Sequence, residues 1–200
     1  MRGGRLFRPR LVSPSRDAAG REAAQAERFR LVMLPHLDAA YSFARYLTRD
    51  SVAAEDAVQD AFLRAFRGFD GWRGDNPRAW LFAIVRHRCL DAMTARRDPL
   101  RGAEPVEAID RDSAVAAAEP GALEDQAARR SEIAMLRGAI ESLPEPFREA
   151  LVLRELEELS YKDIATVTGA PIGTVMSRLA RARQMLATLL LPPVSRKAQA

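Results

Sequence analysis

Apolar residues recur along this chain at intervals of three and four positions, the spacing that gathers side chains on one face of an α-helix. No stretch alternates apolar and polar residues as a half-buried strand does. The pattern therefore predicts an all-α fold. The predicted helices cover approximately residues 27–48, 51–67, 77–97, 123–141, 147–157 and 160–168, and the last begins at about residue 171.

Residues that begin or break helices mark the ends of these stretches. Pro35 predicts a break in the first stretch, and Asp50 or Ser51 is expected to cap the second. Asn76 followed by Pro77 is typical of a helix start, because asparagine accepts a hydrogen bond from the first turn and proline lacks an amide hydrogen that this turn leaves unbonded.

Two segments lack helical periodicity and divide the chain. Residues 1–25 mix Arg, Gly, Pro and Ser and are expected to form a flexible basic tail. Residues 98–122 are rich in Pro, Gly, Ala and acids, and a segment of this length is expected to be a flexible linker rather than a loop within one domain. The chain is therefore predicted to hold two small helical domains with separate cores, at residues 26–97 and 123–191, followed by a tail at 192–200.

Composition and charge narrow the range of functions. The chain has 31 Lys and Arg residues against 27 Asp and Glu, an excess that permits a polyanionic partner without requiring one. All but two of these basic residues are arginines, which fits genome base composition as well as phosphate recognition. Cys89 is the single cysteine, and neither His36 nor His87 lies in a metal-binding or catalytic pattern. We predict no enzymatic activity, cofactor, metal site or small-molecule substrate.

The chain also lacks the sequence patterns of membrane and exported proteins. No apolar run reaches the roughly 18 residues that a membrane span requires, and the arginine-rich start has no apolar core of a signal peptide. A single cysteine suits a reducing compartment. We therefore expect a cytoplasmic protein with no direct membrane insertion.

The segment from Ser160 to Arg183 has the pattern of a helix, a tight turn and a second helix. Ser160 and Asp163 have the spacing of a capping box, in which each side chain bonds an amide of the first turn. Gly169 can adopt the left-handed conformation that ends a helix, and Pro171 suits the first turn of the next one. The geometry predicted is that of a helix-turn-helix domain.

The second helix of this unit is amphipathic. Its predicted apolar face consists of Ile172, Val175, Leu179, Ala182 and Leu186. The opposite face carries small side chains and arginines without acids, which suits entry into a DNA major groove, and it consists of Thr174, Ser177, Arg178 and Arg181. The alternative is a structural hairpin with a solvated polar face.

Two long segments resemble one known family. "LPEPFREALVLRELEELSYKDIATVTGAPIGTVMSRLARARQML" resembles the carboxy-terminal promoter-binding domain of bacterial sigma-70 factors, specifically of the extracytoplasmic function (ECF) group. "AEDAVQDAFLRAFRGFDGWRGDNPRAWLFAIVRHRCLDAMTARR" is similar to the amino-terminal domain of that group. The resemblance implies an alternative sigma factor, which binds core RNA polymerase, directs it to specific promoters and assists promoter melting.

The resemblance also implies where partners would bind. Asp56, Gln59 and Asp60 share one helical face, and residues at these positions in the family dock on the coiled coil of the polymerase β′ subunit. The alternative for these three residues is an ordinary solvated acidic face. The β subunit, promoter DNA and an anti-sigma factor are the other partners that the resemblance implies.

Aromatic residues lie among arginines from Phe69 to Arg97, which suits a DNA strand whose bases leave the duplex. The resemblance implies that the loop around Gly74 holds a flipped base of the minus-10 element and that the following helix reads this element. The candidates for this role are Trp72, Asp75, Asn76, Arg78 and Arg86. Asn76 remains open between helix cap and DNA reader, whereas Trp80 and Phe82 are expected to be core residues.

In the family, the helix from Pro171 onward reads the minus-35 element. This assigns base or phosphate contacts to Thr174, Ser177, Arg178 and Arg181, whereas Met176 departs from the basic residue that many relatives carry. Arg183 is expected to support the fold or a flanking phosphate. Two alternative functions remain open: a helix-turn-helix regulator that does not engage polymerase, and a helical adaptor without promoter affinity.

Overall fold

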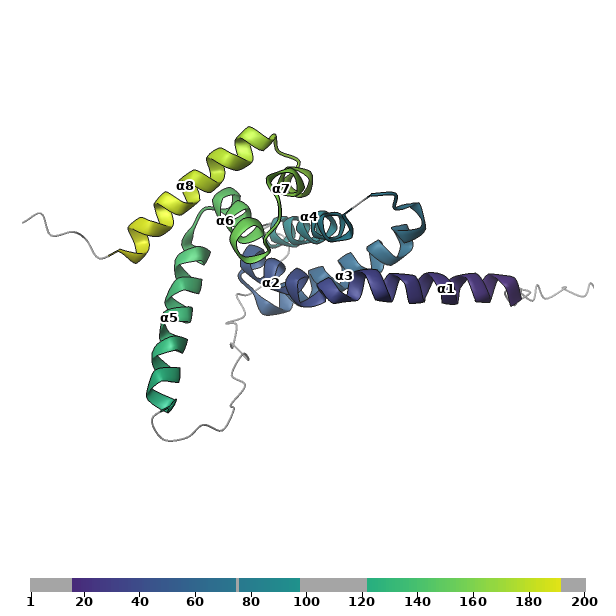
Figure 1. The fold of residues 1–200 in the computed structure, drawn as a ribbon, viewed down its shortest axis with the longest axis horizontal. Helices are drawn as coiled ribbons and strands as arrows, with labels where there is room; N and C mark the ends of the chain where they lie inside the picture. Colours follow the sequence, from purple (N-terminus) through teal and green to yellow (C-terminus); the bar gives the residue numbers. More distant parts are fainter. Residues whose placement is uncertain (1–15, 75, 98–121, 192–200) are drawn as a thin grey trace, which may run out of the picture.

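The computed structural model describes residues 16–74, 76–97 and 122–191, which form helices joined by short turns (Figure 1). This part of the chain contains no strand, and the predicted all-α class is confirmed. The elements of the first domain are α1 (Arg16–Met33), η1 (Leu34–His36), α2 (Leu37–Thr48), α3 (Ser51–Gly68), η2 (Phe69–Gly71) and α4 (Pro77–Arg97). Those of the second domain are α5 (Ala122–Ser142), α6 (Glu145–Leu151), η4 (Val152–Leu156), α7 (Tyr161–Thr168) and α8 (Ile172–Leu190).

The helix-breaking and capping residues act as their chemistry predicts. Pro35 lies in the 3₁₀ turn η1, which separates α1 from α2. Asp50 caps α3 by accepting a hydrogen bond from the Ala53 amide at 3.0 Å. Asn76 likewise accepts one from the Ala79 amide at 3.0 Å, and α4 begins at the next residue.

Helix α1 corrects one prediction. It begins at Arg16, so the predicted tail over residues 1–25 is wrong for residues 16–25, and the first 15 residues lie outside the described ones. The helical part is rich in Ala, Glu, Gln and Arg, which have high helix propensity without needing a buried face. Gln25 also donates a hydrogen bond from its side-chain amide to the Phe66 carbonyl at 3.3 Å. The predicted segments 98–121 and 192–200 also lie outside the described residues.

Aromatic side chains join the helices of the first domain. The ring of Phe29 meets those of Phe66 and Phe69 edge to face, each with centroids 5.3 Å apart. Phe43 of α2 stacks on Phe82 of α4 with centroids 5.2 Å apart. Phe82 is fully buried, as predicted, and these contacts fix α4 against α1, α2 and α3.

The helix-turn-helix unit is present with one change in its cap. The Ser160 hydroxyl accepts a hydrogen bond from the Asp163 amide at 3.1 Å, and Gly169 ends α7 with φ of 67°. The Asp163 carboxylate, however, accepts a bond from the Ser160 hydroxyl at 2.6 Å instead of reaching the Ser160 amide. The carboxylate therefore orients the capping hydroxyl, and the turn has the predicted geometry.

The helix predicted over residues 147–157 begins earlier and changes its winding. Helix α6 starts at Glu145, and residues 152–156 form a π turn in which the Glu157 amide donates to the Val152 carbonyl at 3.0 Å. Glu158 then adopts a left-handed conformation with φ of 51°. The result is that Glu157 is buried although it carries a carboxylate.

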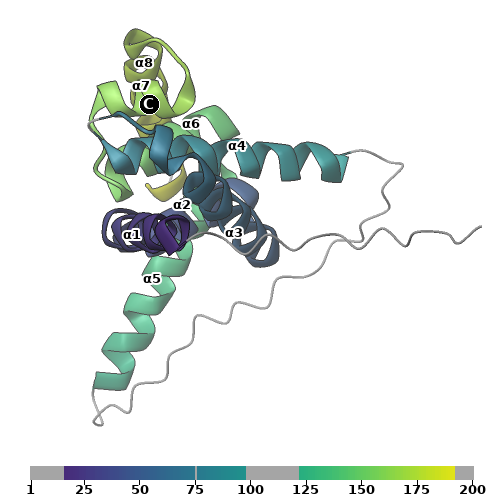
Figure 2. The same ribbon diagram turned by 90° about the vertical axis from the view of Figure 1, so that its right-hand side faces the viewer.

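The two domains lie against each other, which differs from the predicted separate cores. Helix α4 contacts α7, and α2 contacts α6, so the buried apolar residues of both domains form one continuous cluster (Figures 1 and 2). Arg148 of α6 donates to the Leu47 carbonyl at 3.3 Å, and Arg49 donates to the Leu143 carbonyl at 3.2 Å. The periodicity of each helix locates its apolar face but does not reveal which domain edges meet.

Candidate functional site

The outer face of α8 is the first candidate surface. Ser177 and Arg181 are exposed, and Thr174 and Arg178 are half-buried. Neither arginine forms an ion pair with any described residue. The surface keeps the uncompensated positive charge that the sequence predicts, and it faces away from α4 (Figure 1).

The inner face of α8 departs from prediction at its start. Val175, Leu179 and Ala182 are buried as expected, whereas Ile172 is 46% exposed because it opens the helix before α8 packs on its neighbours. Arg183 pairs with Glu155 at 2.6 Å. This contact ties α8 to the π turn η4.

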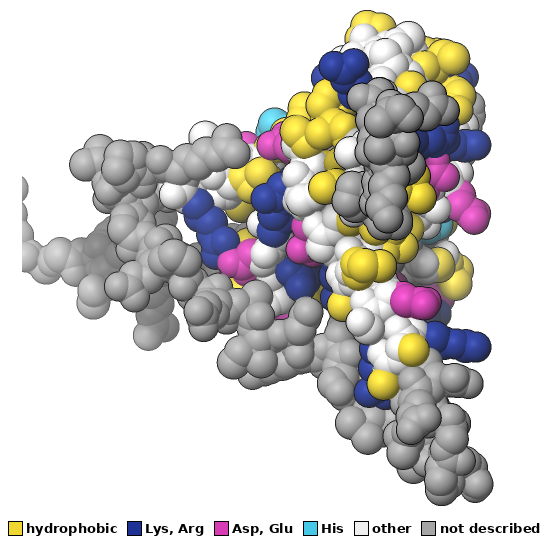
Figure 3. All heavy atoms as spheres, turned by 90° about the vertical axis from the view of Figure 1, so that its left-hand side faces the viewer, with side chains coloured by type: hydrophobic (Ala, Val, Ile, Leu, Met, Phe, Trp, Pro, Cys, Tyr) yellow, Lys and Arg dark blue, Asp and Glu magenta, His cyan; other side chains and the backbone are white. Residues whose placement is uncertain are grey.

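Charge elsewhere on the molecule is mixed. On the face that Figure 3 shows, Lys and Arg side chains form separate groups with Asp and Glu side chains among them. The modest net charge of +4 agrees with this distribution. A polyanion would therefore be held at particular sites and not along one continuous basic band.

The loop before α4 holds an aromatic stack. The ring of Trp72 lies 6.0 Å from that of Phe69 and 6.0 Å from that of Trp80. A side chain at Gly74 would meet the Trp72 indole nitrogen at 2.8 Å, so glycine allows the loop to close against the ring. Trp72 and Trp80 are half-buried, and Asp75 lies outside the described residues.

The predicted readers on α4 have partners in the second domain. Arg78 donates to the Glu157 carboxylate at 2.6 Å, and Arg86 donates to Glu149 through two nitrogens, the longer bond being 3.4 Å. Asn76 serves as a helix cap. The sequence predicted these arginines but not their acidic partners, because a lone glutamate among apolar residues was the only signal.

Burial raises the pKa of both acidic partners. Glu149 and Glu157 have side chains only 2% and 5% exposed. Loss of hydration raises the pKa of each carboxyl, and the paired arginine lowers it in part. The ion pairs thus offset a cost of burial that they do not remove completely.

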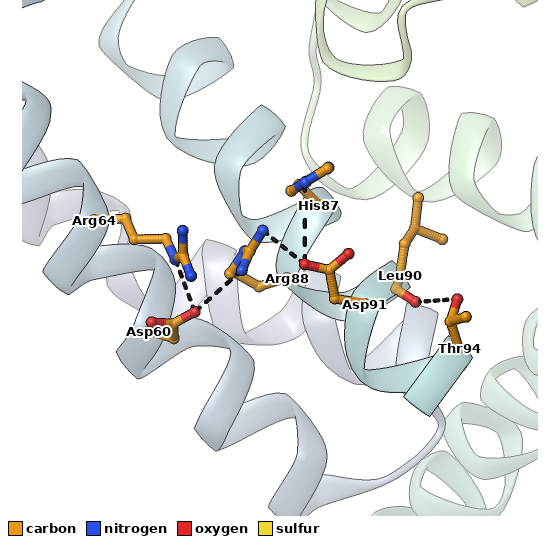
Figure 4. Close-up of polar contacts among 7 residues, drawn as sticks. All are labelled: Asp60, Arg64, His87, Arg88, Leu90, Asp91 and Thr94. Carbon is orange, nitrogen blue, oxygen red and sulfur yellow. Dashed lines mark hydrogen bonds and ion pairs between the residues drawn. The ribbon is translucent and has the colours of Figure 1, made fainter. Parts of the chain in front are cut away.

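The acidic face of α3 is divided between exposed and paired residues. Asp56 and Gln59 are exposed, whereas Asp60 is half-buried and accepts a bond from Arg64 at 3.0 Å (Figure 4). Arg88 of α4 lies 3.5 Å from the same carboxylate. The hydrogen bond from Arg64, ahead of the charge of Arg88, holds the pKa of Asp60 below its ordinary value.

Arg88 extends this polar cluster along α4. It pairs with Asp91 at 2.7 Å, and His87 lies 4.0 Å from the same carboxylate (Figure 4). Asp60 therefore joins α3 to α4 in addition to presenting charge to solvent.

A groove of about 490 Å³ adjoins Asp56 and Gln59. Leu37 and Tyr41 of α2 form one wall, and Val58, Gln59 and Phe62 of α3 form the other. The sequence placed Val58 and Phe62 in the apolar stripe of α3 but did not predict an opening beside it. The 40% exposure of Leu37, an apolar residue, marks the groove as a surface suited to an apolar partner.

Among the described residues there is no group of three or more His, Cys, Asp or Glu arranged to hold a metal ion. Burial, with a contribution from Glu149, raises the pKa of the Cys89 thiol to about 12. The thiol therefore stays protonated and unreactive at neutral pH. None of the helices described is both long and apolar enough to cross a bilayer.

Family models match both domains. The model described as Sigma-70 region 2 matches residues 33–98, and the one described as Sigma-70, region 4 matches residues 133–186. The RNA polymerase sigma-H factor of Pseudomonas aeruginosa is 40% identical over 149 residues, which cover 72% of this chain and 76% of that protein. The ECF RNA polymerase sigma-E factor of Escherichia coli K12 is 35% identical over 156 residues, covering 76% and 81%.

Solved structures show the same architecture. The sigma factor RpoE in complex with the anti-sigma factor NepR from Bartonella quintana has a TM-score of 0.64 at 32% identity, covering 82% of this chain and 97% of that one. CnrH in complex with the cytosolic domain of CnrY has a TM-score of 0.59 at 27% identity, covering 86% and 94%. Both are two-chain complexes, whereas the present chain stands alone.

Proposed function

The chain belongs to the ECF group of the sigma-70 family, and from this we infer that it is an alternative sigma factor. It binds core RNA polymerase, directs the enzyme to specific promoters and assists promoter melting. The observation that carries this function is the presence of both sigma regions, in order, in one chain. A helix-turn-helix regulator that ignores polymerase is not favoured, since it would leave the match over residues 33–98 unexplained.

The chain acts by binding and not by catalysis, in the cytoplasm where transcription takes place. Residues 26–97 would engage polymerase and the minus-10 element, and residues 123–191 would engage the minus-35 element. An anti-sigma factor is a further proposed partner, because two structurally similar sigma factors are bound to such proteins or to a cytosolic domain that occupies the same role.

The proposed polymerase-docking surface is the exposed part of α3 with the neighbouring groove. Asp56 and Gln59 supply polar groups, and the wall formed by Leu37, Val58 and Phe62 supplies an apolar seat. A helical partner with basic and apolar residues, such as the β′ coiled coil, would complement both features. Asp60 would contribute less directly, because Arg64 and Arg88 already hold its carboxylate.

The proposed minus-35 surface is the outer face of α8. Ser177 and Arg181 are open to solvent, and Arg178 lies beside them. Small side chains let the helix enter a major groove, and unpaired guanidinium groups bond base edges or phosphates. The proposed minus-10 surface combines Trp72, as a stacking platform, with the arginines of α4.

Run-off transcription with purified core polymerase on a promoter library tests the function. The wild-type chain is expected to support transcripts that core polymerase alone does not make. Asp56→Arg is expected to weaken core binding by at least about tenfold, because it reverses charge at an exposed docking position. The matched control is Glu22→Arg, which makes the same charge change at an exposed position on α1.

Asp56 is the cleaner choice for this test, since replacing Asp60 would also disrupt the contact between α3 and α4. Equal core binding by the Asp56 and Glu22 variants would reject the docking surface. A folded chain that supports no transcript with any library promoter would reject the function.

A further inference from the structure

We propose that the second domain of the free chain closes over the minus-10 face of α4 and keeps this face from DNA through Glu149 and Glu157. These carboxylates neutralise the arginines that DNA phosphates would otherwise contact. The inference rests on the proposed function and concerns the regulation of its minus-10 site. We call the pairs Arg78–Glu157 and Arg86–Glu149 the latch.

The latch uses the chemistry of phosphate recognition. Arg86 donates to Glu149 through both Nε and an Nη2 group, a forked arrangement that a guanidinium also forms with phosphate. Arg78 donates to Glu157 at 2.6 Å. A DNA backbone and the second domain would therefore compete for the same two cations.

The latch is incomplete as a purely structural contact. The Nε of Arg78 is buried without a hydrogen-bond partner. An unsatisfied buried donor destabilises the state that contains it. Burial also disfavours the charged form of both glutamates, as their raised pKa values indicate. These features weaken the closed arrangement and allow DNA to compete with it.

The backbone of the second domain is shaped to deliver one half of the latch. The π turn η4 and the left-handed Glu158 lie on either side of Glu157. Both conformations are uncommon and are found preferentially at functional sites. A regular helix through this segment would place the Glu157 side chain in a different direction.

The remaining interdomain bonds avoid the predicted DNA-binding residues. Arg148 and Arg49 bond the carbonyls of Leu47 and Leu143, which are groups of α2 and of the end of α5. These bonds bring the α2 and α6 edges together, while the latch acts at α4. The outer face of α8 stays open (Figure 1), so closure blocks the proposed minus-10 surface and leaves the minus-35 surface free.

The test compares two double variants of the full chain. Glu149→Gln with Glu157→Gln removes the latch charges while keeping side-chain size. The control is Glu132→Gln with Glu155→Gln, which makes the same charge change at exposed residues of the second domain. The probe is a fluorescent single-stranded DNA of about 12 nucleotides with random sequence, used without polymerase.

The latch variant is expected to bind the probe about tenfold more tightly than the wild-type chain. The control is expected to change affinity by less than about twofold, because it raises the net charge equally without freeing the arginines. Equal affinities of the two variants would overturn the proposal.

A distance measurement on the wild-type latch gives a second test that does not require the variants to fold. Dyes attached at Asp70→Cys and Gln184→Cys report the separation of the domains by energy transfer, and buried Cys89 stays unlabelled. Saturation with the single-stranded probe is expected to lower the transfer efficiency. An unchanged efficiency with the probe bound would overturn the proposal.

The two levels of inference fail separately. Absence of run-off transcripts would remove the sigma-factor function, whereas the polymerase-free measurements would still report whether the latch opens. Normal transcripts combined with an inert latch would remove only the inference drawn in this section.

Discussion

Replacement of Asp50 tests how the first domain is held together. One oxygen of Asp50 accepts a hydrogen bond from the Ala53 amide at 3.0 Å and so caps α3. The other accepts a bond from Arg96 at 2.6 Å and so ties α3 to α4. Asp50→Ala removes both interactions, whereas Asp50→Asn keeps an oxygen for the cap and loses the ion pair.

The magnitudes follow from the exposure of each partner. Loss of a helix cap lowers the free energy of unfolding by about 1 kcal/mol. The ion pair is worth at most about 1 kcal/mol, because the Arg96 side chain is 43% exposed and solvent screens it. Asp50→Ala is therefore expected to cost about 1.5–2 kcal/mol, and Asp50→Asn about half as much or less.

The pH dependence has a defined sign. Burial raises the pKa of Asp50, but the bonds from Ala53 and Arg96 outweigh burial and hold it below its ordinary value of 3.8. A carboxyl with a lowered pKa contributes stability that is present above its unfolded pKa and is lost as the pH falls through the folded pKa. The difference between wild type and Asp50→Asn is thus expected to shrink below about pH 4.

Urea unfolding at pH 7 and at several acidic values measures these differences, with the midpoint and slope fitted together. Ser51→Ala is a suitable control, since Ser51 lies beside the cap without forming its bond. An Asp50→Asn variant as unstable as Asp50→Ala would show that the ion pair, and not the cap, dominates. A difference between wild type and Asp50→Asn that persists unchanged to pH 2 would refute the linkage.

Two further predictions use the turn and the lone thiol. Gly169→Ala is expected to lower the free energy of unfolding by about 1 kcal/mol, because φ at this position is 67°; a urea midpoint equal to that of wild type would contradict this. Cys89 is expected to react with a thiol reagent only after denaturation, because the group is buried and its pKa is raised to about 12. Rapid reaction of the native chain at neutral pH, with Lys162→Cys as an exposed positive control, would show that the core opens more readily than the structure indicates.

Local chemistry explains what could be predicted from the sequence. The cap at Asp50, the Asn76 and Pro77 start of α4 and the left-handed Gly169 each depend on residues within four positions, and the structure confirms all three. The exposed Ser177 and Arg181 follow from helical periodicity in the same way. Their roles in binding DNA stay predictions.

Long-range contacts explain most of what could not be predicted. Arg78 and Glu157 are 79 positions apart, and Arg86 and Glu149 are 63 apart, so no local pattern links them. Separate cores were expected because a long segment divides the helical groups, yet length does not decide whether domains touch. The start of α1 at Arg16 was missed for a different reason: an exposed helix leaves no apolar periodicity to detect.

The π turn at Val152–Leu156 also has a consequence for insertions and deletions in this chain. A π turn contains one residue more than the regular helix that would replace it. Deleting a single residue there would rotate everything downstream by about 100° relative to α6. The recognition helix would then present another side to its surroundings, so one surplus residue sets the angular register of the whole carboxy-terminal unit.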